Sequence, residues 1–146
     1  MKAKLINETL DNFEKKSDPL ISLGVGKKAL ITKWLDEMNI KSYKINSDFS
    51  IDTQKGVDLN KKNLIKLPDY IKFNKVNGYF DLLQNHLISL KGSPEIVESI
   101  FCCAYNDLET LEGCPKYAKT FQCWNNKKQF TKEYVTSLCK ANTIIV

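Results

Sequence analysis

The chain of 146 residues has 42% hydrophobic and 27% charged residues, the balance of an ordinary globular domain. Its net charge of +5 comes from lysines spread along polar stretches. Specific nucleic-acid binding usually uses Arg and stacking aromatics grouped together, so nucleic acid is an unlikely partner. No stretch approaches the roughly 18 apolar residues that cross a bilayer. Five cysteines, none in the N-terminal half, predict reduced thiols rather than a disulfide framework.

The N-terminal third of the chain predicts helices followed by a hairpin. Residues 3–15 have apolar side chains near helical spacing, and Pro19 ends that helix. A second amphipathic helix is predicted over residues 27–38. Apolar residues then alternate on both sides of Asn-Ser-Asp within residues 43–51, which predicts a β-hairpin. Together, residues 1–56 are expected to form a helical leader and hairpin that cap one end of the domain.

From residue 57 the chain repeats itself in steps of 20–23 residues. The segment "FDLLQNHLISLKGSP" begins at Phe80, "FCCAYNDLETLEGCP" at Phe101 and "FQCWNN" at Phe121. A degenerate first copy begins at Val57. An apolar-x-apolar-x-x-Asn-x-Leu-x-x-Leu pattern at this period is typical of leucine-rich repeats. The sequence therefore predicts an α/β fold in which residues 57–130 form short leucine-rich-repeat-like coils.

Each position of the repeat has a physical role. Asn85, Asn106 and Asn126 are predicted to point inward as a structural ladder that binds backbone groups of the neighbouring coil. Cys103 and Cys123 take the inward position held by leucine in an earlier copy, and are expected in the core. Coils cannot bury their apolar faces alone, so both ends of a stack need covers.

The last 16 residues, 131–146, are expected to form a helix and tail that cover the other end of the stack. Thr131 is a suitable N-cap for a helix over residues 131–141, with Asn142 as its C-cap. The closing "TIIV" is expected to be extended. The three regions are predicted to form one compact domain.

Nothing in the pattern predicts an enzyme. His86 is the only histidine, and the cysteines lack C-x-x-C spacing, so neither a metal site nor a Cys-His nucleophile is expected. The "GVGKK" segment at residues 24–28 lacks the spacing of a phosphate-binding loop. Asp107 and Glu109 are interpreted as solvated charges. We predict no catalytic residues, no metal and no cofactor.

The outward positions of the strands form the candidate protein-binding surface. These residues lie between or just after the inward apolar positions, and Tyr105 flanks them. They are Asp81, Leu83, Cys102, Ala104, Tyr105, Gln122 and Trp124. A Leu and a Trp on a sheet face, flanked by polar side chains, are the mixture expected at protein interfaces. The alternative is that Trp124 lies beneath the C-terminal helix as part of the cap.

Three segments carry a resemblance to a known family. "GYFDLLQNHLISLKGSPEIV", "FCCAYNDLETLEGCPKYA" and "FQCWNNKKQFTKEYV" resemble the degenerate leucine-rich-repeat proteins encoded by tailed bacteriophages. The likeness covers residues 17–137, although the array is short and Leu82 stands where a cysteine is usual. It implies a non-catalytic protein–protein interaction module. Such a module would be a structural or accessory virion component, or an inhibitor of a host protein, located in the virion or the host cytoplasm.

Overall fold

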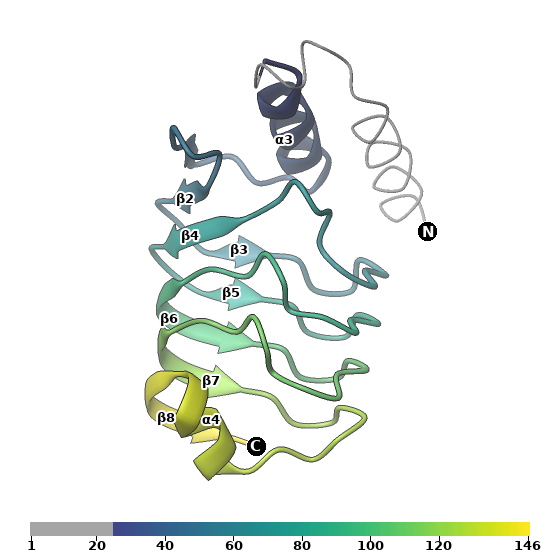
Figure 1. Cartoon of the computed structure of the whole chain (residues 1–146), viewed down its shortest axis with the longest axis vertical. Helices are drawn as coiled ribbons and strands as arrows, with labels where there is room; N and C mark the ends of the chain where they lie inside the picture. The colour runs from purple at the N-terminus through teal and green to yellow at the C-terminus, as the bar shows by residue number, and fades with distance from the viewer. Residues whose placement is uncertain (1–24) are drawn as a thin grey trace.

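The computed structural model describes residues 25–146, which form a β-solenoid with two helices (Figure 1). The helix predicted over 3–15 and its break at Pro19 lie outside the described residues. The helices are α3 (Val25–Glu37) and α4 (Lys132–Leu138). The strands are β1 (Tyr43–Ile45), β2 (Ile51–Thr53), β3 (Val57–Asp58), β4 (Phe73–Val76), β5 (Phe80–Asp81), β6 (Ile96–Cys102), β7 (Tyr117–Gln122) and β8 (Lys140–Ile145).

All eight strands belong to one sheet that stacks the repeats as about four parallel turns. β6 is long enough to pair with both β4 and β5, which belong to the preceding coil. β7 then pairs along β6, and β8 along β7, always in parallel. Among the strands of residues 25–146, only the predicted hairpin, β1 with β2, is antiparallel. A mixed α/β solenoid was therefore predictable from the repeat.

A column of aromatic rings runs along the core. Phe80, Phe101 and Phe121 occupy the same position in successive coils, and their ring centroids lie 6.1 and 5.1 Å apart. Phe73 contacts Phe80 at 5.0 Å, and Trp34 of α3 contacts Phe73 at 6.5 Å. All five are fully buried. This column joins α3 to the coils, so α3 covers one end of the solenoid (Figure 1).

The three repeat asparagines lie inside the stack and bond to backbone. The side-chain oxygen of Asn85 accepts hydrogen bonds from the amides of Lys62 and Leu64, at 2.9 and 3.0 Å. Its amide group donates to the carbonyls of Leu59 and Leu82, at 2.9 and 3.0 Å. One side chain thus ties two successive coils together.

The other two asparagines repeat this geometry one and two coils further on. Asn106 accepts from the amide of Leu87 at 2.9 Å, and Asn126 accepts from the amide of Leu108 at 3.0 Å. Asn126 also donates to the carbonyl of Cys103 at 3.1 Å. The ladder occupies the positions that the repeat pattern assigned to it.

The residue before each ladder position has a left-handed backbone that the sequence pattern did not reveal. Lys61, Gln84, Tyr105 and Asn125 have φ values of 52°, 53°, 56° and 53°. Non-glycine residues rarely adopt this conformation, and here it recurs in every coil. The turn directs the next side chain inward, toward the neighbouring coil.

The C-terminal part differs from the prediction. Thr131 is the N-cap, as predicted, and accepts from the amide of Tyr134 at 3.1 Å. The helix, however, ends at Leu138 with Cys139 as its C-cap, and Asn142 lies within β8. The chain after Cys139 keeps the register of the earlier coils, so it joins the sheet rather than extending the helix. Strand β8, not the helix, forms the last layer of the stack.

Candidate functional site

The predicted binding residues do lie on one face, because their strands are in register. Asp81 is aligned with Cys102, and Cys102 with Gln122. Asp81 and Gln122 are half-buried, as are Leu83 and Trp124 in the next column. The structure therefore brings these residues together across three coils.

Two of the predicted surface residues are buried instead. Cys102 is 6% exposed and Ala104 is 0% exposed, so neither offers surface to a partner. Both have small side chains and belong to the middle coil. Cys102 lies between the larger Asp81 and Gln122 of the adjacent strands, and Ala104 lies in the next column, between the larger Leu83 and Trp124. The prediction that Cys102 and Ala104 face outward into solvent was wrong for this reason.

Three predicted residues of this face are apolar and remain accessible: Leu83, Tyr105 and Trp124. We call these three residues the aromatic cluster, after the two rings. The rings of Tyr105 and Trp124 meet edge to face, with centroids 6.4 Å apart and an interplanar angle of 82°. Tyr105 is 47% exposed and Trp124 is half-buried. Trp124 is thus partly open to solvent, and it shares a hollow with Phe130, the residue before the N-cap of the C-terminal helix.

Backbone contacts hold the aromatic cluster in place. The amide of Tyr105 donates to the carbonyl of Trp124 at 3.0 Å, and the amide of Gln84 donates to the carbonyl of Ala104 at 3.2 Å. Tyr105 itself occupies the left-handed turn before Asn106. Because the ladder fixes this turn, the ring is presented from a rigid backbone.

Polar groups border the cluster on one side. Asp81 accepts hydrogen bonds from the amide of Leu83 at 2.9 Å and from the side chain of Asn60 at 3.2 Å. Asp58 accepts from the amide of Asn60 at 3.0 Å. These carboxylates orient the loops of the face, which is a positioning role rather than an acid–base one.

A hollow of about 290 Å³ borders the cluster on the other side. Trp124 lines it together with Phe130 and Val146, and the polar side chains of Asn125 and Gln129 complete its rim. The face therefore combines the exposed ring of Tyr105, the half-buried ring of Trp124 and a mostly polar hollow with hydrogen-bonding groups.

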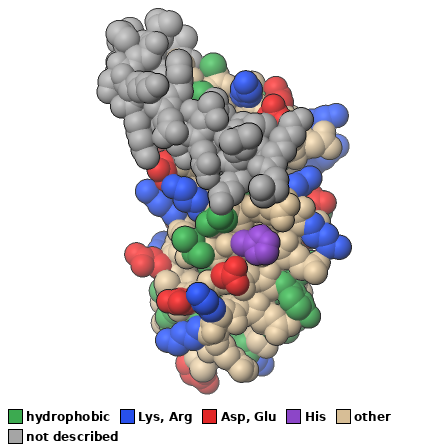
Figure 2. Space-filling view, turned by 90° about the vertical axis from the view of Figure 1, so that its right-hand side faces the viewer, with side chains coloured by type: hydrophobic (Ala, Val, Ile, Leu, Met, Phe, Trp, Pro, Cys, Tyr) green, Lys and Arg blue, Asp and Glu red, His purple; other side chains and the backbone are tan. Residues whose placement is uncertain are grey.

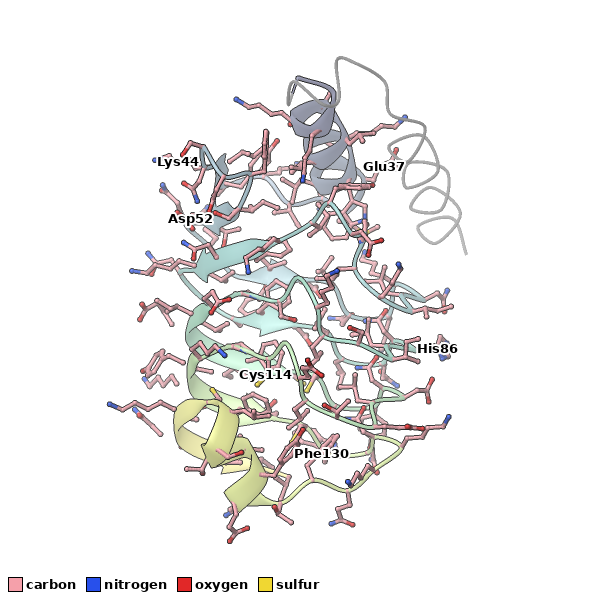
Figure 3. All side chains as sticks on the ribbon, in the orientation of Figure 1. Glu37, Lys44, Asp52, His86, Cys114 and Phe130 are labelled. Carbon is pink, nitrogen blue, oxygen red and sulfur yellow. The ribbon has the colours of Figure 1, made fainter. Side chains whose placement is uncertain are left out.

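The cysteines are placed for packing rather than for reaction. All five are free and buried, and Cys114 lies inside the coils in Figure 3. Burial raises the pKa of Cys114 to about 12, and those of Cys123 and Cys139 to about 11. Thiols of this kind stay protonated near neutral pH and are poor nucleophiles. Within residues 25–146, no group of three His, Cys, Asp or Glu side chains could hold a metal ion.

The single histidine lies on the outer rim of the loops. His86 is at the edge of the molecule in Figure 3, and in Figure 2 it is the purple side chain beside an acidic one. Its Nδ1 is 3.7 Å from a carboxylate oxygen of Asp107, with both side chains about half or more exposed. Lys127 and Glu109 form a similar exposed pair at 3.8 Å. Pairs of this kind contribute little stability and give no catalytic geometry.

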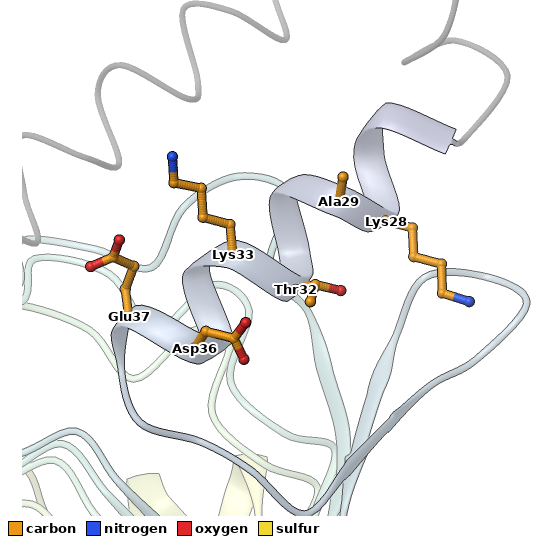
Figure 4. Close-up of a pocket in the computed structure, with 6 residues that line it drawn as sticks. All are labelled: Lys28, Ala29, Thr32, Lys33, Asp36 and Glu37. Atoms are coloured by element: carbon orange, nitrogen blue, oxygen red, sulfur yellow. The ribbon is translucent and has the colours of Figure 1, made fainter.

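An open hollow lies on the outer side of α3. Its volume is about 830 Å³, and Lys28, Lys33, Asp36 and Glu37 are among its lining residues. In Figure 4 these charged side chains diverge around the helix rather than converging on one point. The hollow therefore lacks the convergent groups of a ligand site.

Comparisons with known proteins give no relative. No known protein family, no curated protein and no solved structure matches the chain. In the part of the chain that the structure describes, no helix has the length and apolar character to span a membrane.

Proposed function

We propose that this protein is a non-catalytic protein-binding module whose contact surface is the aromatic cluster. The observation that carries the proposal is the exposed Tyr105–Trp124 pair, held by a backbone that the Asn106 ladder position fixes. Tyr and Trp are enriched among the residues that dominate binding energy at interfaces. A rigid backbone reduces the entropy lost when the rings are immobilised by a partner.

The surroundings of the cluster support a protein partner over a small ligand. The mostly polar hollow lies beside Trp124, and the two rings and Leu83 form an apolar centre. Asp81, Gln122 and Gln129 form a polar border around it. An apolar centre with a polar rim is the usual anatomy of a protein interface.

The resemblance of the repeats to phage-encoded proteins suggests the setting. We propose that the chain is a structural or accessory component of a virus particle, with a host-directed inhibitor as the second candidate. A short, rigid stack with a small contact area favours the first, because a wide target would need a longer array.

The test is a capture experiment with two matched variants. The tagged chain is incubated with virion proteins and, separately, with uninfected host lysate. Tyr105→Asn removes the ring while keeping a residue that tolerates the left-handed backbone. Tyr79→Asn is the control, because Tyr79 is 46% exposed against 47% for Tyr105 but lies outside the cluster.

We expect capture of a virion protein by the native chain and by Tyr79→Asn, with at least about a tenfold weaker affinity for Tyr105→Asn. A host protein with the same pattern would favour the inhibitor. Equal binding by both variants would remove the aromatic cluster from the function.

A further inference from the structure

The end of the solenoid formed by β8 leaves its core positions partly open. Val97 and Ala118 hold the same inward position in β6 and β7, and both are 0% exposed. Ala141, next in that column, is only half-buried. In the neighbouring column Phe121 is fully buried and Ile144 is half-buried. In the part of the chain that the structure describes, each inner coil is covered on both sides, whereas the β8 layer is covered on one side.

The same end carries an unpaired sheet edge. Among the described strands, β8 pairs with β7 alone. The carbonyl of Ile145 accepts from the amide of Cys123 at 3.0 Å, so the Ile145 backbone faces β7. Backbone groups of a strand alternate in direction, so those of Ile144 point to the open edge. An exposed edge beside partly exposed apolar side chains is a template for pairing with another strand.

We propose that this end is a self-association surface on which β8 of one copy pairs antiparallel with β8 of a second copy. A second copy cannot stack head to tail, because α3 covers its opposite end through Trp34 and Phe73 (Figure 1). Its own β8 end is open in the same way, so the two β8 ends can meet. Antiparallel pairing of identical strands satisfies both edges at once through a two-fold axis.

The charge of β8 is compatible with this pairing. Among residues 140–146 only Lys140 is charged, and it lies at one end of the strand. A two-fold axis beside Thr143 would place this residue opposite its own copy and the two Lys140 side chains at opposite ends. The Lys140 side chains would be about 20 Å apart, at about 3.4 Å per residue, which exceeds the screening length of about 8–10 Å. The pair of strands therefore brings no like charges together.

The experiment measures mass in solution and uses complementary charges at the proposed axis. Sedimentation velocity is run from about 1 µM to about 500 µM on the native chain and on Thr143→Lys and Thr143→Glu. Thr143 is exposed, and residues opposite each other in such a pair have Cβ atoms about 5 Å apart. Thr136→Lys, on an exposed position of α4, is the matched control.

We expect a concentration-dependent shift of the native chain and of Thr136→Lys from 16.8 kDa to twice that mass. Each Thr143 variant alone should dimerise at least about tenfold more weakly, and an equimolar mixture of the two should recover the dimer. A native chain that stays monomeric throughout would overturn the proposal. A dimer that both Thr143 variants retain would overturn it as well. Tyr105→Asn should dimerise normally, so this test and the capture test fail independently.

Discussion

Ser93 and Cys114 hold the same position in successive coils, but only the side chain of Cys114 has a hydrogen-bond partner within the described part of the chain. The Cys114 thiol donates to the carbonyl of Pro115 at 3.6 Å. Ser93 is 4% exposed, and its hydroxyl has no partner within the described part of the chain. A buried hydroxyl without a partner costs about 1–3 kcal/mol, whereas a thiol is a weakly polar group that packs like a small apolar one.

We therefore expect Ser93→Cys to raise the free energy of unfolding by about 1 kcal/mol. Urea unfolding followed by tryptophan fluorescence measures this change. Ser99→Cys is the control, because Ser99 is half-buried and should change stability by less than about 0.5 kcal/mol. A loss of stability in Ser93→Cys would show that the hydroxyl has a partner, such as a buried water.

The buried thiols also set the alkaline limit of stability. Burial raises the pKa of Cys114 from 9.0 to about 12, so the folded chain holds this proton more tightly than the unfolded chain. The resulting stabilisation is complete below pH 9 and is lost as the pH rises from 9 toward 12. Each thiol that ionises only on unfolding lowers the free energy of unfolding by up to about 1.4 kcal/mol per pH unit in this window.

We expect Cys114→Ala to be less stable than the native chain at pH 8, since it leaves a cavity, but to lose less stability between pH 8 and pH 10.5. The measurement is urea unfolding at several pH values on both chains. The two chains differ in this one ionisable group, so the difference in slope reports the thiol. Parallel curves would contradict the assignment.

At the scale of the elements, the asparagine ladder links one coil to the next. Asn106 is 7% exposed and donates to the carbonyls of Leu82 and Cys103, at 2.9 and 3.2 Å, besides accepting from Leu87. Asn126 makes similar bonds in a half-exposed position near the end of the stack. Truncating a ladder asparagine leaves its backbone partners without hydrogen bonds. The resulting loss of stability should be largest where water cannot reach those partners.

We expect Asn106→Ala to lower the free energy of unfolding by about 3 kcal/mol or more, and Asn126→Ala by about 1–2 kcal/mol. Denaturant unfolding of the two variants and the native chain gives both values. Equal losses would mean that burial does not control the strength of the ladder. An Asn106→Ala chain as stable as the native one would contradict its structural role.

Some elements were predictable because their signal is local. The helix predicted over 27–38 is α3, since its apolar stripe faces the coils, and the repeat spacing placed Asn85 and Asn106 inside. The end of α4 was not predictable, because the residues after Cys139 could continue a helix or join a sheet. These residues form a strand because they pair with β7, which lies 23 positions earlier in the chain.

The candidate site shows the same limit. Alternation along a strand gives the direction of a side chain but not what covers it. The alternation places Ala104 on the outward side, and yet the structure buries it fully, between larger residues of its column. The Tyr105–Trp124 contact depends on the left-handed turn at Tyr105, which has no signature in the sequence because no glycine stands there.

At the scale of the whole molecule, the solenoid is a one-dimensional stack. Each coil contacts mainly its neighbours, so local stability depends on whether a layer is covered on both sides. β6 lies between β7 and the pair β4 and β5, whereas β8 contacts β7 alone among the described strands. Opening of the β8 end therefore breaks one interface, and opening of β6 breaks two.

This difference predicts a gradient of hydrogen exchange along the chain. In the monomeric Thr143→Lys variant, amides of β8 and α4 should exchange at least about tenfold faster than those of β6 and β7. Mass spectrometry of peptides from each strand measures the rates. In the native chain at high concentration, β8 should gain protection as its edge is paired, while β6 should not change. Uniform exchange along the stack would contradict the layered stability. If the protection of β8 did not depend on concentration, the result would contradict self-association through β8 and leave the layered stability as it stands.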